Sequence, residues 1–445
     1  MGHEMALRLH ATDTAFDTEF ARFLALKREI SSDVEDAVRK IIADVVSGGD
    51  QTLFDLTYTF DRHRLGPETL AVSKQEIAEA AALCASETLD ALNFAHQRIQ
   101  AHHERQKPND DRYTDAIGAE LGYRWTAIQS VGLYVPGGLA NYPSSVLMNA
   151  VPAKVAGVGR IVMVVPTPDG RINPLVLAAG QIAGVDEIYR IGGAQAVAAL
   201  AYGTESIAPV AKIVGPGNAY VAAAKRQVFG TVGIDSIAGP SEVLVIADQD
   251  NNPDWIAADL LAQAEHDTAA QSILMTDCAT FADAVEAAVE RQLKTLPRAD
   301  IATASWRDFG ATIILSSLDQ APPLADQIAA EHLEIATSHS EALADRITNA
   351  GAIFLGRYTP EVIGDYVSGS NHVLPTARSA RFSSGLGVLD FMKRTSLLKL
   401  TPAALAELGP AAMTLATAEG LDAHRRSVEI RMSPHSDDPH GNGRP

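Results

Sequence analysis

Cysteine is almost absent from this chain: Cys84 and Cys278 are the only two among 445 residues. Two thiols cannot form a disulfide framework for a chain of this length, and proteins of reducing compartments seldom contain disulfides. The stretch from Met1 to His10 also lacks the basic flank and apolar run of a secretory signal. We therefore expect a cytoplasmic protein.

Positive charge and long apolar runs are also scarce. The chain has 36 Lys and Arg against 55 Asp and Glu, which gives a formal net charge of -19. Because nucleic-acid binding depends on clustered Lys and Arg, we expect no nucleic-acid partner. No window reaches the roughly 20 apolar residues that cross a bilayer, so we expect no membrane partner. With 47% hydrophobic residues, the chain has enough apolar mass for roughly two to four domains of about 150 residues each.

Apolar spacing divides the chain into three kinds of segment. Residues 33–47 and 74–105 show the three- and four-residue spacing of helices. From about Gly132, short β-branched runs alternate with Ala-rich helical stretches, as in parallel α/β sheets. After Arg378 we expect no further strands, only helices at residues 402–416 and 420–431. The sequence therefore predicts two Rossmann-like parallel-sheet α/β domains with small helical N- and C-terminal segments.

The turn Gly215-Pro216-Gly217-Asn218 lies between a predicted strand and a predicted helix. Its glycines allow close backbone approach, and the free N–H groups of a helix start favour an anion. Tyr220 occupies the place of the third glycine of a dinucleotide fingerprint, whereas Asp235 stands at the distance expected of a ribose partner. The turn is thus either a phosphate-binding loop or a plain structural turn.

Two more turns of the same half resemble it, at residues 134–138 and 191–195. Glycine turns at the carboxyl ends of successive parallel strands surround the crevice in which open α/β sheets bind ligands. We therefore expect a ligand at this edge of the sheet.

Gln263 and His266 stand three residues apart at the end of a predicted helix, so both project from one face. That face could hold a metal, although a helix-terminal His stabilised by the helix dipole is the alternative. Further donors would be Asp365 and His424. Oxygen and imidazole donors without thiolate suit zinc, or manganese as a substitute.

Glu331 and His332 stand where a predicted helix over residues 324–331 meets a predicted strand over residues 333–336. Histidine titrates near neutral pH, and an adjacent carboxylate can activate water. The pair is therefore equipped for proton removal at two stages of a reaction, unless it is simply solvated surface.

The ordered motifs of this chain resemble those of the histidinol dehydrogenase family over residues 21–431. Seven strings in the family's order carry the resemblance. They are Gly132-Leu-Tyr-Val-Pro-Gly-Gly138, Gly215-Pro-Gly-Asn218, Ala238-Gly-Pro-Ser-Glu-Val-Leu244, Gln263-Ala-Glu-His-Asp267, Glu331-His-Leu-Glu334, Gly364-Asp365 with Ser370-Asn-His-Val-Leu-Pro-Thr376, and Glu419-Gly-Leu-Asp-Ala-His424.

The resemblance implies an activity: oxidation of L-histidinol to L-histidine by two NAD in succession, through an enzyme-held aldehyde, as the last step of histidine biosynthesis. It also implies residue roles. One zinc per subunit would bind Gln263, His266, Asp365 and His424. His332 would take the alcohol proton, and Glu331 would activate water. Substrate contacts would include Ser241, His372 and Glu419 together with His332 and the metal ligands, and NAD contacts would be Tyr134, Gln195 and Asn218.

The family also implies an intertwined homodimer, in which His424 and Glu419 act in the neighbour's site. For the domains we expect an N-terminal arm over residues 1–26 and an NAD-binding α/β domain over residues 111–235. A second α/β domain, built from residues 27–110 and 236–380, would carry the metal and acid/base residues. Residues 381–445 would form a small helical domain with a disordered tail.

Three other functions remain open from the residues. One is a zinc- and NAD-dependent dehydrogenase of another amino or sulfonated alcohol on the same fold. Another is a zinc hydrolase in which Glu331 activates water and the glycine loops are only turns. The third is a non-catalytic relative, which the retention of every metal donor and of Glu331 and His332 argues against.

Overall fold

The computed structural model describes residues 6–25, 32–137, 142–237 and 239–433. It separates into two compact units. The larger unit comprises residues 1–107 and 128–391, and the smaller comprises residues 108–127 and 392–445. Of the residues and ranges named above, residues 1–5 and 26–31, Gly138, Ala238 and the tail from 434 lie outside the described residues.

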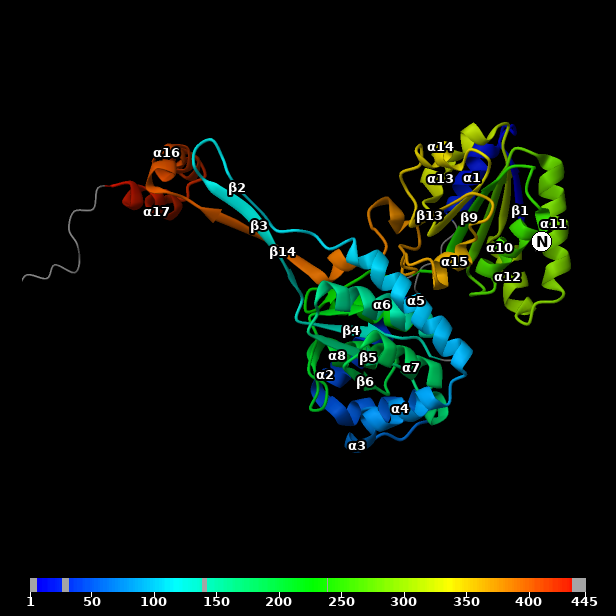
Figure 1. Cartoon of the computed structure of the whole chain (residues 1–445), viewed down its shortest axis with the longest axis horizontal. Coiled ribbons are helices and arrows are strands. Elements are labelled where there is room, and N and C mark those ends of the chain that lie inside the picture. The colour runs from blue at the N-terminus through cyan, green and yellow to red at the C-terminus, as the bar shows by residue number, and fades with distance from the viewer. Residues whose placement is uncertain (1–5, 26–31, 138–141, 238, 434–445) are drawn as a thin grey trace, which may run out of the picture. The chain divides into compact units, whose positions relative to one another are not determined.

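A six-stranded parallel sheet occupies one part of the larger unit (Figure 1). Each neighbouring pair of strands is parallel. Apolar residues fill both faces, as is usual for strands buried between helices. The strand order is β1 (Leu7–His10), β11 (Ala311–Ile314), β10 (Gln271–Thr276), β9 (Glu242–Ala247), β12 (His332–Ala336) and β13 (Ala352–Leu355).

Helices cover both faces of this sheet and fix its two cores. On one face the core contains α10 (Pro253–Ala264), α11 (Ala279–Leu293) and α12 (Ala299–Phe309). On the other it contains residues of α1 (Phe16–Leu24), α13 (Ala321–Ile328) and α14 (Ser340–Ala344). Alternation along the strands separates the cores, since Val243 and Val245 belong to the first and Leu244 and Ile246 to the second. The short helix α15 (Glu361–Tyr366) follows β13 and contacts α10.

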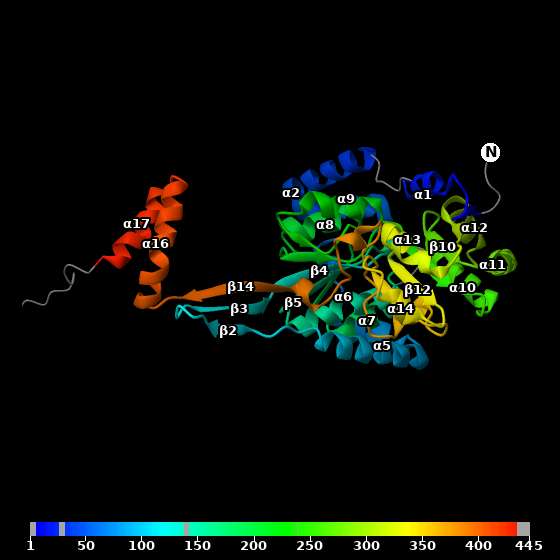
Figure 2. The ribbon, with the colours of Figure 1, turned by 90° about the horizontal axis from the view of Figure 1, so that it is seen from above.

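A five-stranded parallel sheet forms the other part of the larger unit. Its order is β6 (Glu187–Tyr189), β5 (Arg160–Val164), β4 (Ser130–Tyr134), β7 (Lys212–Val214) and β8 (Gly233–Ile234). Figure 2 shows the helices in two layers about this sheet. One layer holds α2 (Ser32–Asp61), α8 (Gly193–Tyr202) and α9 (Ala219–Val228), and the other holds α5 (Ser86–Glu104), α6 (Pro143–Ala156) and α7 (Pro174–Ala183).

These two sheets confirm the predicted class of fold, but the N-terminal residues pack differently from the expected grouping. Helix α2 contacts α8 and α9, and α4 (Lys74–Ala82) contacts α7. Val38, Val45 and Leu53 accordingly belong to the core of the five-stranded sheet. Residues 32–104 therefore pack mainly on the five-stranded sheet, which differs from the expected grouping. Arg98 and His103 of α5 also contact the loop over residues 367–371. The N-terminal arm packs with the domain over residues 236–380, because β1 pairs with β11.

The smaller unit contains an antiparallel sheet in the order β14-β3-β2 and two helices that pack on each other. The strands are β2 (Asp111–Thr114), β3 (Glu120–Ala127) and β14 (Met392–Lys399), and the helices are α16 (Pro402–Ala418) and α17 (Asp422–Met432). Our expectation that strands end after Arg378 is wrong. Strand β14 is largely exposed, so its residues lack the buried alternation by which a strand is recognised, and its partner lies more than 260 residues earlier.

The helix before Glu331 ends earlier than predicted. Helix α13 ends at Ile328, and Ala329 adopts a left-handed conformation with φ of 49°. Glu331 therefore precedes β12 instead of closing a helix. The predicted helix over residues 74–105 is two helices, α4 and α5, because Ser86 starts a new helix after a turn.

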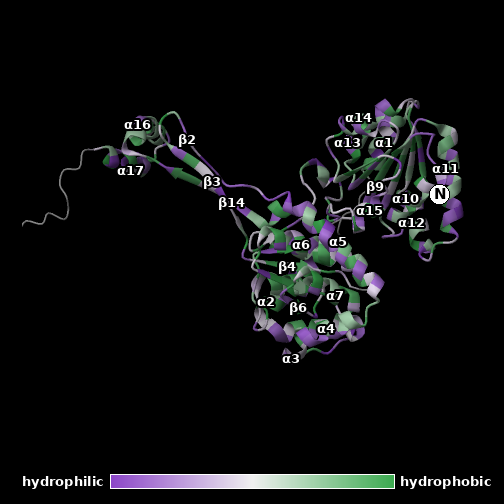
Figure 3. Cartoon of the chain, viewed as in Figure 1, coloured by the Kyte–Doolittle hydropathy of each residue, from purple (hydrophilic) through white to green (hydrophobic). Residues whose placement is uncertain are grey.

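Figure 3 shows apolar residues along the central strands and mixed colouring on outer helices such as α11. Within the described residues, no helix is both long and apolar enough to span a membrane.

Candidate active site

The proposed acid/base pair lies at the amino ends of two adjacent strands. His332 is the first residue of β12, and it is in register with Val243 of β9. Ser241 directly precedes β9, and Glu331 directly precedes β12. The two motifs Ser241-Glu242 and Glu331-His332 are therefore neighbours in space although they lie far apart in the chain.

The Glu331 carboxyl group is buried and held by the other strand. Its Oε2 accepts the backbone N–H of Glu242 at 3.1 Å, and the Ser241 side chain also bonds to it. Burial raises the pKa of Glu331 to about 7, and the favourable interaction with His332 offsets only part of that effect. A carboxyl group with such a pKa can exchange a proton near neutral pH.

The His332 imidazole is surrounded by acidic groups. Its Nδ1 lies 3.3 Å from the Glu242 carbonyl oxygen, 3.8 Å from Glu361 Oε2 and 3.9 Å from Glu331 Oε2. Its Nε2 lies 3.5 Å from Asp365 Oδ1. Burial by itself would lower the pKa of His332, but the carboxylates of Glu361, Glu331 and Asp365 outweigh burial and raise that pKa well above its usual value.

Helix α15 brings two carboxyl groups to His332, one of which the sequence analysis missed. Glu361 is 2% exposed and neither of its carboxyl oxygens has a hydrogen-bond partner among the described residues. Burial raises the pKa of Glu361 to about 8. His332, Glu361 and Asp365 each offer a ligand atom, and these atoms lie within 4.8 Å of one another. The spacing of Glu361 and Asp365 over one helical turn was the available signal.

Gln263 and His266 stand at the end of α10, beside this acidic group. Gln263 is fully buried, yet neither atom of its amide has a hydrogen-bond partner in the part of the chain that the structure describes. His266 is exposed by its surface area, but the protein atoms around its imidazole lower the pKa of His266, and Asp365 partly opposes that shift.

This donor set fits a divalent metal. An unpartnered amide oxygen in a buried position is costly unless something binds it, and Gln263 supplies such an oxygen. Asp365 interacts electrostatically with His266, His332 and His372, and these histidines help to lower the pKa of Asp365 against the effect of burial. Oxygen and imidazole donors of this kind suit zinc.

His372 lies in the loop after α15. Its Nδ1 is 3.0 Å from the Asp365 carbonyl oxygen, and its Nε2 is 3.2 Å from the hydroxyl of Ser145 on α6. Burial lowers the pKa of His372, which favours the neutral imidazole. The preceding Asn371 accepts the N–H of Val373 and donates to the Met148 carbonyl oxygen, so the loop is tied to α6.

Glu419 and His424 belong to the smaller unit. Glu419 caps the end of α16, and His424 lies in the first turn of α17. Both side chains are exposed on that unit. The structure does not place the units relative to each other, so the roles of these two residues stay predictions.

The proposed NAD contacts lie at the carboxyl ends of the five-stranded sheet. Tyr134 ends β4, and its buried hydroxyl accepts the N–H of Gly193; burial raises the pKa of Tyr134 to about 12. Gln195 is 3% exposed, and its Oε1 has no hydrogen-bond partner among the described residues. The turns pack closely, since a Cβ on Gly215 would lie 2.2 Å from the Tyr134 carbonyl oxygen.

Two features of the Gly215 turn favour the alternative of a plain structural turn. The N–H groups of Tyr220 and Val221 at the start of α9 are not free, because the side chain of Asn218 accepts both. Asp235 is not free for a ribose either. It accepts the N–H of Gly215 at 2.7 Å and forms a buried ion pair with Lys225. The side chains of Asn218 and Asp235 thus hold the turn and the start of α9 in place.

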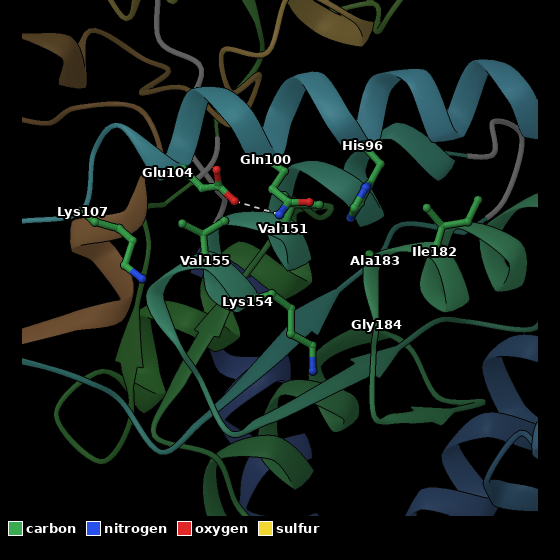
Figure 4. A pocket seen from close by; sticks show the side chains of 10 residues that line it. All are labelled: His96, Gln100, Glu104, Lys107, Val151, Lys154, Val155, Ile182, Ala183 and Gly184. Carbon is green, nitrogen blue, oxygen red and sulfur yellow. Dashed lines mark hydrogen bonds between the residues drawn. The ribbon is translucent and has the colours of Figure 1, made fainter.

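A separate cavity of ≈ 410 Å³ lies among α5, α6 and α7 (Figure 4). On the wall that α5 forms, Gln100 donates to Glu104, one turn further along the same helix, at 2.8 Å. No residue proposed above for metal, substrate or NAD lines this cavity.

Comparison with known proteins identifies the family. A family model described as histidinol dehydrogenase matches residues 25–432. The chain belongs to the histidinol dehydrogenase family. It is 67% identical over 429 residues to the histidinol dehydrogenase of Mesorhizobium japonicum, an alignment that covers 96% of this chain and 100% of the relative. It is 68% identical over 429 residues to that of Bradyrhizobium diazoefficiens, with the same coverage of both chains.

A solved structure agrees. The crystal structure of histidinol dehydrogenase from Elizabethkingia anophelis matches with a TM-score of 0.92 and 36% identity, over 97% of this chain and 99% of that one. Histidinol dehydrogenases are NAD- and zinc-dependent oxidoreductases of histidine biosynthesis, and this chain is an enzyme of that kind.

Proposed function

We propose that Glu331 and His332 divide a four-electron oxidation of L-histidinol to L-histidine between them, with two NAD used in succession and the aldehyde held on the enzyme. One observation carries the proposal. The two groups are adjacent and buried, yet face different partners: Glu331 bonds to β9, whereas Nε2 of His332 is directed toward Asp365.

Gln263, His266, Asp365 and His424 would hold the zinc ion. When bound, zinc supplies a fixed positive charge that orients the amine and imidazole nitrogens of the substrate. The unpartnered amide of Gln263 and the grouping of Asp365 with His266 support this assignment. Asp365 also holds the Nε2 side of His332, so the same residue would join the metal site to the acid/base pair.

The hydroxyl proton of the alcohol passes to Nε2 of His332 while hydride passes from the carbon that bears the hydroxyl to NAD, which leaves the aldehyde. Nε2 is the atom that faces the metal ligands, since its neighbour is Asp365 at 3.5 Å, whereas Nδ1 faces the Glu242 carbonyl oxygen. A proton on Nδ1 donated to that carbonyl would hold the ring in the tautomer whose Nε2 accepts.

Glu331 removes a proton from the water that adds to the aldehyde, and the resulting hydrate loses hydride to the second NAD. The N–H of Glu242 and the Ser241 side chain fix the orientation of the carboxylate. Ser241 would also contact the substrate, together with His372 and with Glu419. Tyr134, Gln195 and Asn218 would contact NAD from the edge of the five-stranded sheet.

The functional molecule would be a cytoplasmic homodimer, with Glu419 and His424 supplied by the neighbouring subunit. Both residues stand on the smaller unit, and both are exposed there. Their exposure leaves both side chains accessible to another subunit, which supports a role in a site completed there.

The stoichiometry of the reaction tests the proposed function. NADH formed is measured by absorbance, histidinol consumed by chromatography, and both are compared. We expect two NADH for each histidinol, with little free aldehyde in solution. One NADH for each histidinol, with aldehyde accumulating, would remove Glu331 from its proposed role. If the enzyme oxidised another amino alcohol and not histidinol, the proposed substrate would be wrong.

A further inference from the structure

Glu334 is a carboxyl group in the interior of strand β12, where it is 3% exposed. Strand alternation places it on the same face as His332 and Ala336. Ala336 packs in the core with residues of α10, so this face lies toward α10. A carboxyl group buried on such a face is costly unless it has hydrogen-bond partners.

The structure gives Glu334 two partners from two different helices. Its Oε1 accepts the backbone N–H of Glu361 at 2.6 Å. Glu361 is the first residue of α15, whose N-cap, Pro360, provides no side-chain cap. Glu334 therefore satisfies one of the N–H groups that a helix start leaves unpaired. Its other contact is a side-chain hydrogen bond with Asp259 of α10.

Each element joined in this way carries residues of the active site. Gln263 follows Asp259 by four residues on α10, which places both on one face of that helix. Asp365 follows Glu361 by four residues on α15. His332 precedes Glu334 by two residues on β12. A shift of either helix against the strand would thus move a proposed zinc ligand relative to the acid/base pair.

We propose that Glu334 and Asp259 are positioning residues, which clamp α10 and α15 to β12 and so set the relative places of Gln263, Asp365 and His332. Glu334 works here as a neutral hydrogen-bond donor to Asp259 and as an acceptor for Glu361, and not as a carboxylate. Two carboxyl groups in hydrogen-bond contact share one proton, since two negative charges would repel. Burial and the nearby Asp259 and Glu361 raise the pKa of Glu334 well above its usual value, in agreement with that role.

The test compares Glu334→Gln with Glu334→Leu. Glutamine keeps both contacts, because its amide oxygen can accept from Glu361 and its NH₂ group can donate to Asp259. Leucine keeps the approximate volume and loses both. Zinc affinity is measured on metal-free protein by competition with a chromophoric chelator. We expect the Glu334→Leu variant to bind zinc about 10- to 100-fold more weakly, the range usual for groups that orient metal ligands, and the Glu334→Gln variant to match the wild type.

Kinetics provide a second readout. We expect Glu334→Leu to raise KM for histidinol, because substrate nitrogens depend on the placed metal, and to leave the dissociation constant of NAD unchanged. Asp259→Ala is the milder variant, since Ala suits a helix and leaves the Glu361 contact in place; it should show a smaller change in the same direction. This variant serves if Glu334→Leu does not fold.

A matched control separates positioning from stability. Val289→Ala shortens a fully buried side chain in the same core, on α11, a helix that carries no member of the clamp. It should lower the thermal midpoint and leave zinc affinity unchanged. The proposal is overturned if Glu334→Gln weakens zinc as much as Glu334→Leu does, which would require a charged Glu334, or if Asp259→Ala and Glu334→Leu both retain full affinity.

The inference rests on the proposed zinc site, and its failure is distinguishable from failure of that site. Wild-type protein that takes up no zinc contradicts the proposed function itself. Wild-type protein that binds zinc, with the clamp variants binding it equally well, contradicts only the positioning role.

Discussion

The two parallel sheets of the larger unit present opposite edges to their proposed ligands. At the carboxyl edge of the five-stranded sheet stand glycine turns and neutral side chains, such as Tyr134 and Gln195. At the amino edge of the six-stranded sheet stand ionisable groups, among them Glu331 and His332, with Glu361 and Asp365 from α15. One edge suits close backbone approach to a cofactor, and the other suits proton transfer and metal binding.

The backbone and the side chains thus have different tasks at the two edges. Glycines at the first edge are required sterically: a Cβ on Gly192 would lie 2.3 Å from the Cβ of Pro166. At the second edge, burial shifts the pKa values of the groups, so their chemistry depends on what surrounds them. Changes confined to one edge should therefore leave the function of the other measurable.

Removal of the metal should have the largest effect and should separate the two edges completely. We expect chelation followed by dialysis to abolish NADH formation, because the substrate loses the charge that orients it. NAD binding, measured by calorimetry on the same sample, should survive. Full activity in protein shown to be metal-free would contradict the zinc assignment, and loss of NAD binding would show that the edges are coupled.

Glu331→Gln should divide the reaction into its halves. We expect aldehyde oxidation to fall by about 100-fold or more, the usual scale for a general base, while aldehyde reduction by NADH continues. His332→Asn should damage both directions and serves as the comparison variant. Equal loss in both directions for Glu331→Gln would mean that Glu331 is structural or sets the pKa of His332.

The pH dependence of the two half-reactions should also differ. Glu331 must be ionised to take a proton from water, and burial raises its pKa to about 7. Aldehyde oxidation should therefore fall about tenfold for each pH unit below that value and level off above it. His332 must be neutral to accept the alcohol proton, and its pKa is raised, so alcohol oxidation should keep increasing to higher pH. Stopped-flow measurement of the rate of each half-reaction against pH checks this prediction. A rate of aldehyde oxidation that stays constant between about pH 5 and 7, below the pKa of the base, would argue against Glu331 in that role.

A hybrid dimer tests whether His424 of one subunit completes the site at the amino edge of the six-stranded sheet of the other. The expected effect, a partial recovery of activity, is the smallest of these predictions. Inactive His332→Asn and His424→Ala subunits are unfolded together, refolded and verified by mass. If His424 acts in trans, one site of each hybrid has both lesions and the other has none. Activity should then recover to about half that of a wild-type dimer, given two-fold symmetry. Verified hybrids that stay inactive would place His424 in the site of its own chain.

Much of the local structure could be predicted from the sequence. The strand predicted over residues 333–336 is β12 (His332–Ala336), and the helix predicted over residues 402–416 is α16 (Pro402–Ala418). Such elements are buried on the faces that their own residues define. The exposed strand β14 has no such pattern, because its pairing with β3 depends on residues outside its own window.

The site shows the same limit. Glu331 and His332 could be chosen from their residue types and their place before an apolar run. Glu361 could not, since its spacing from Asp365 is a weak signal by itself, and its significance comes from a contact with His332 across the fold. Asp235 illustrates the opposite case: its spacing suggests a ribose contact, yet the fold uses it to bind Lys225 and Gly215.

The sequence by itself determined the order of motifs, the family they identify and the class of parallel α/β sheets, because these follow from residue types and short-range periodicity. Only the tertiary structure decided that residues 32–104 pack on the five-stranded sheet and that the acid/base pair stands at the amino edge of the other. It also decided that Glu334 joins two helices to one strand. These features depend on contacts between residues far apart in the chain, and a local sequence pattern does not show which distant residues come into contact.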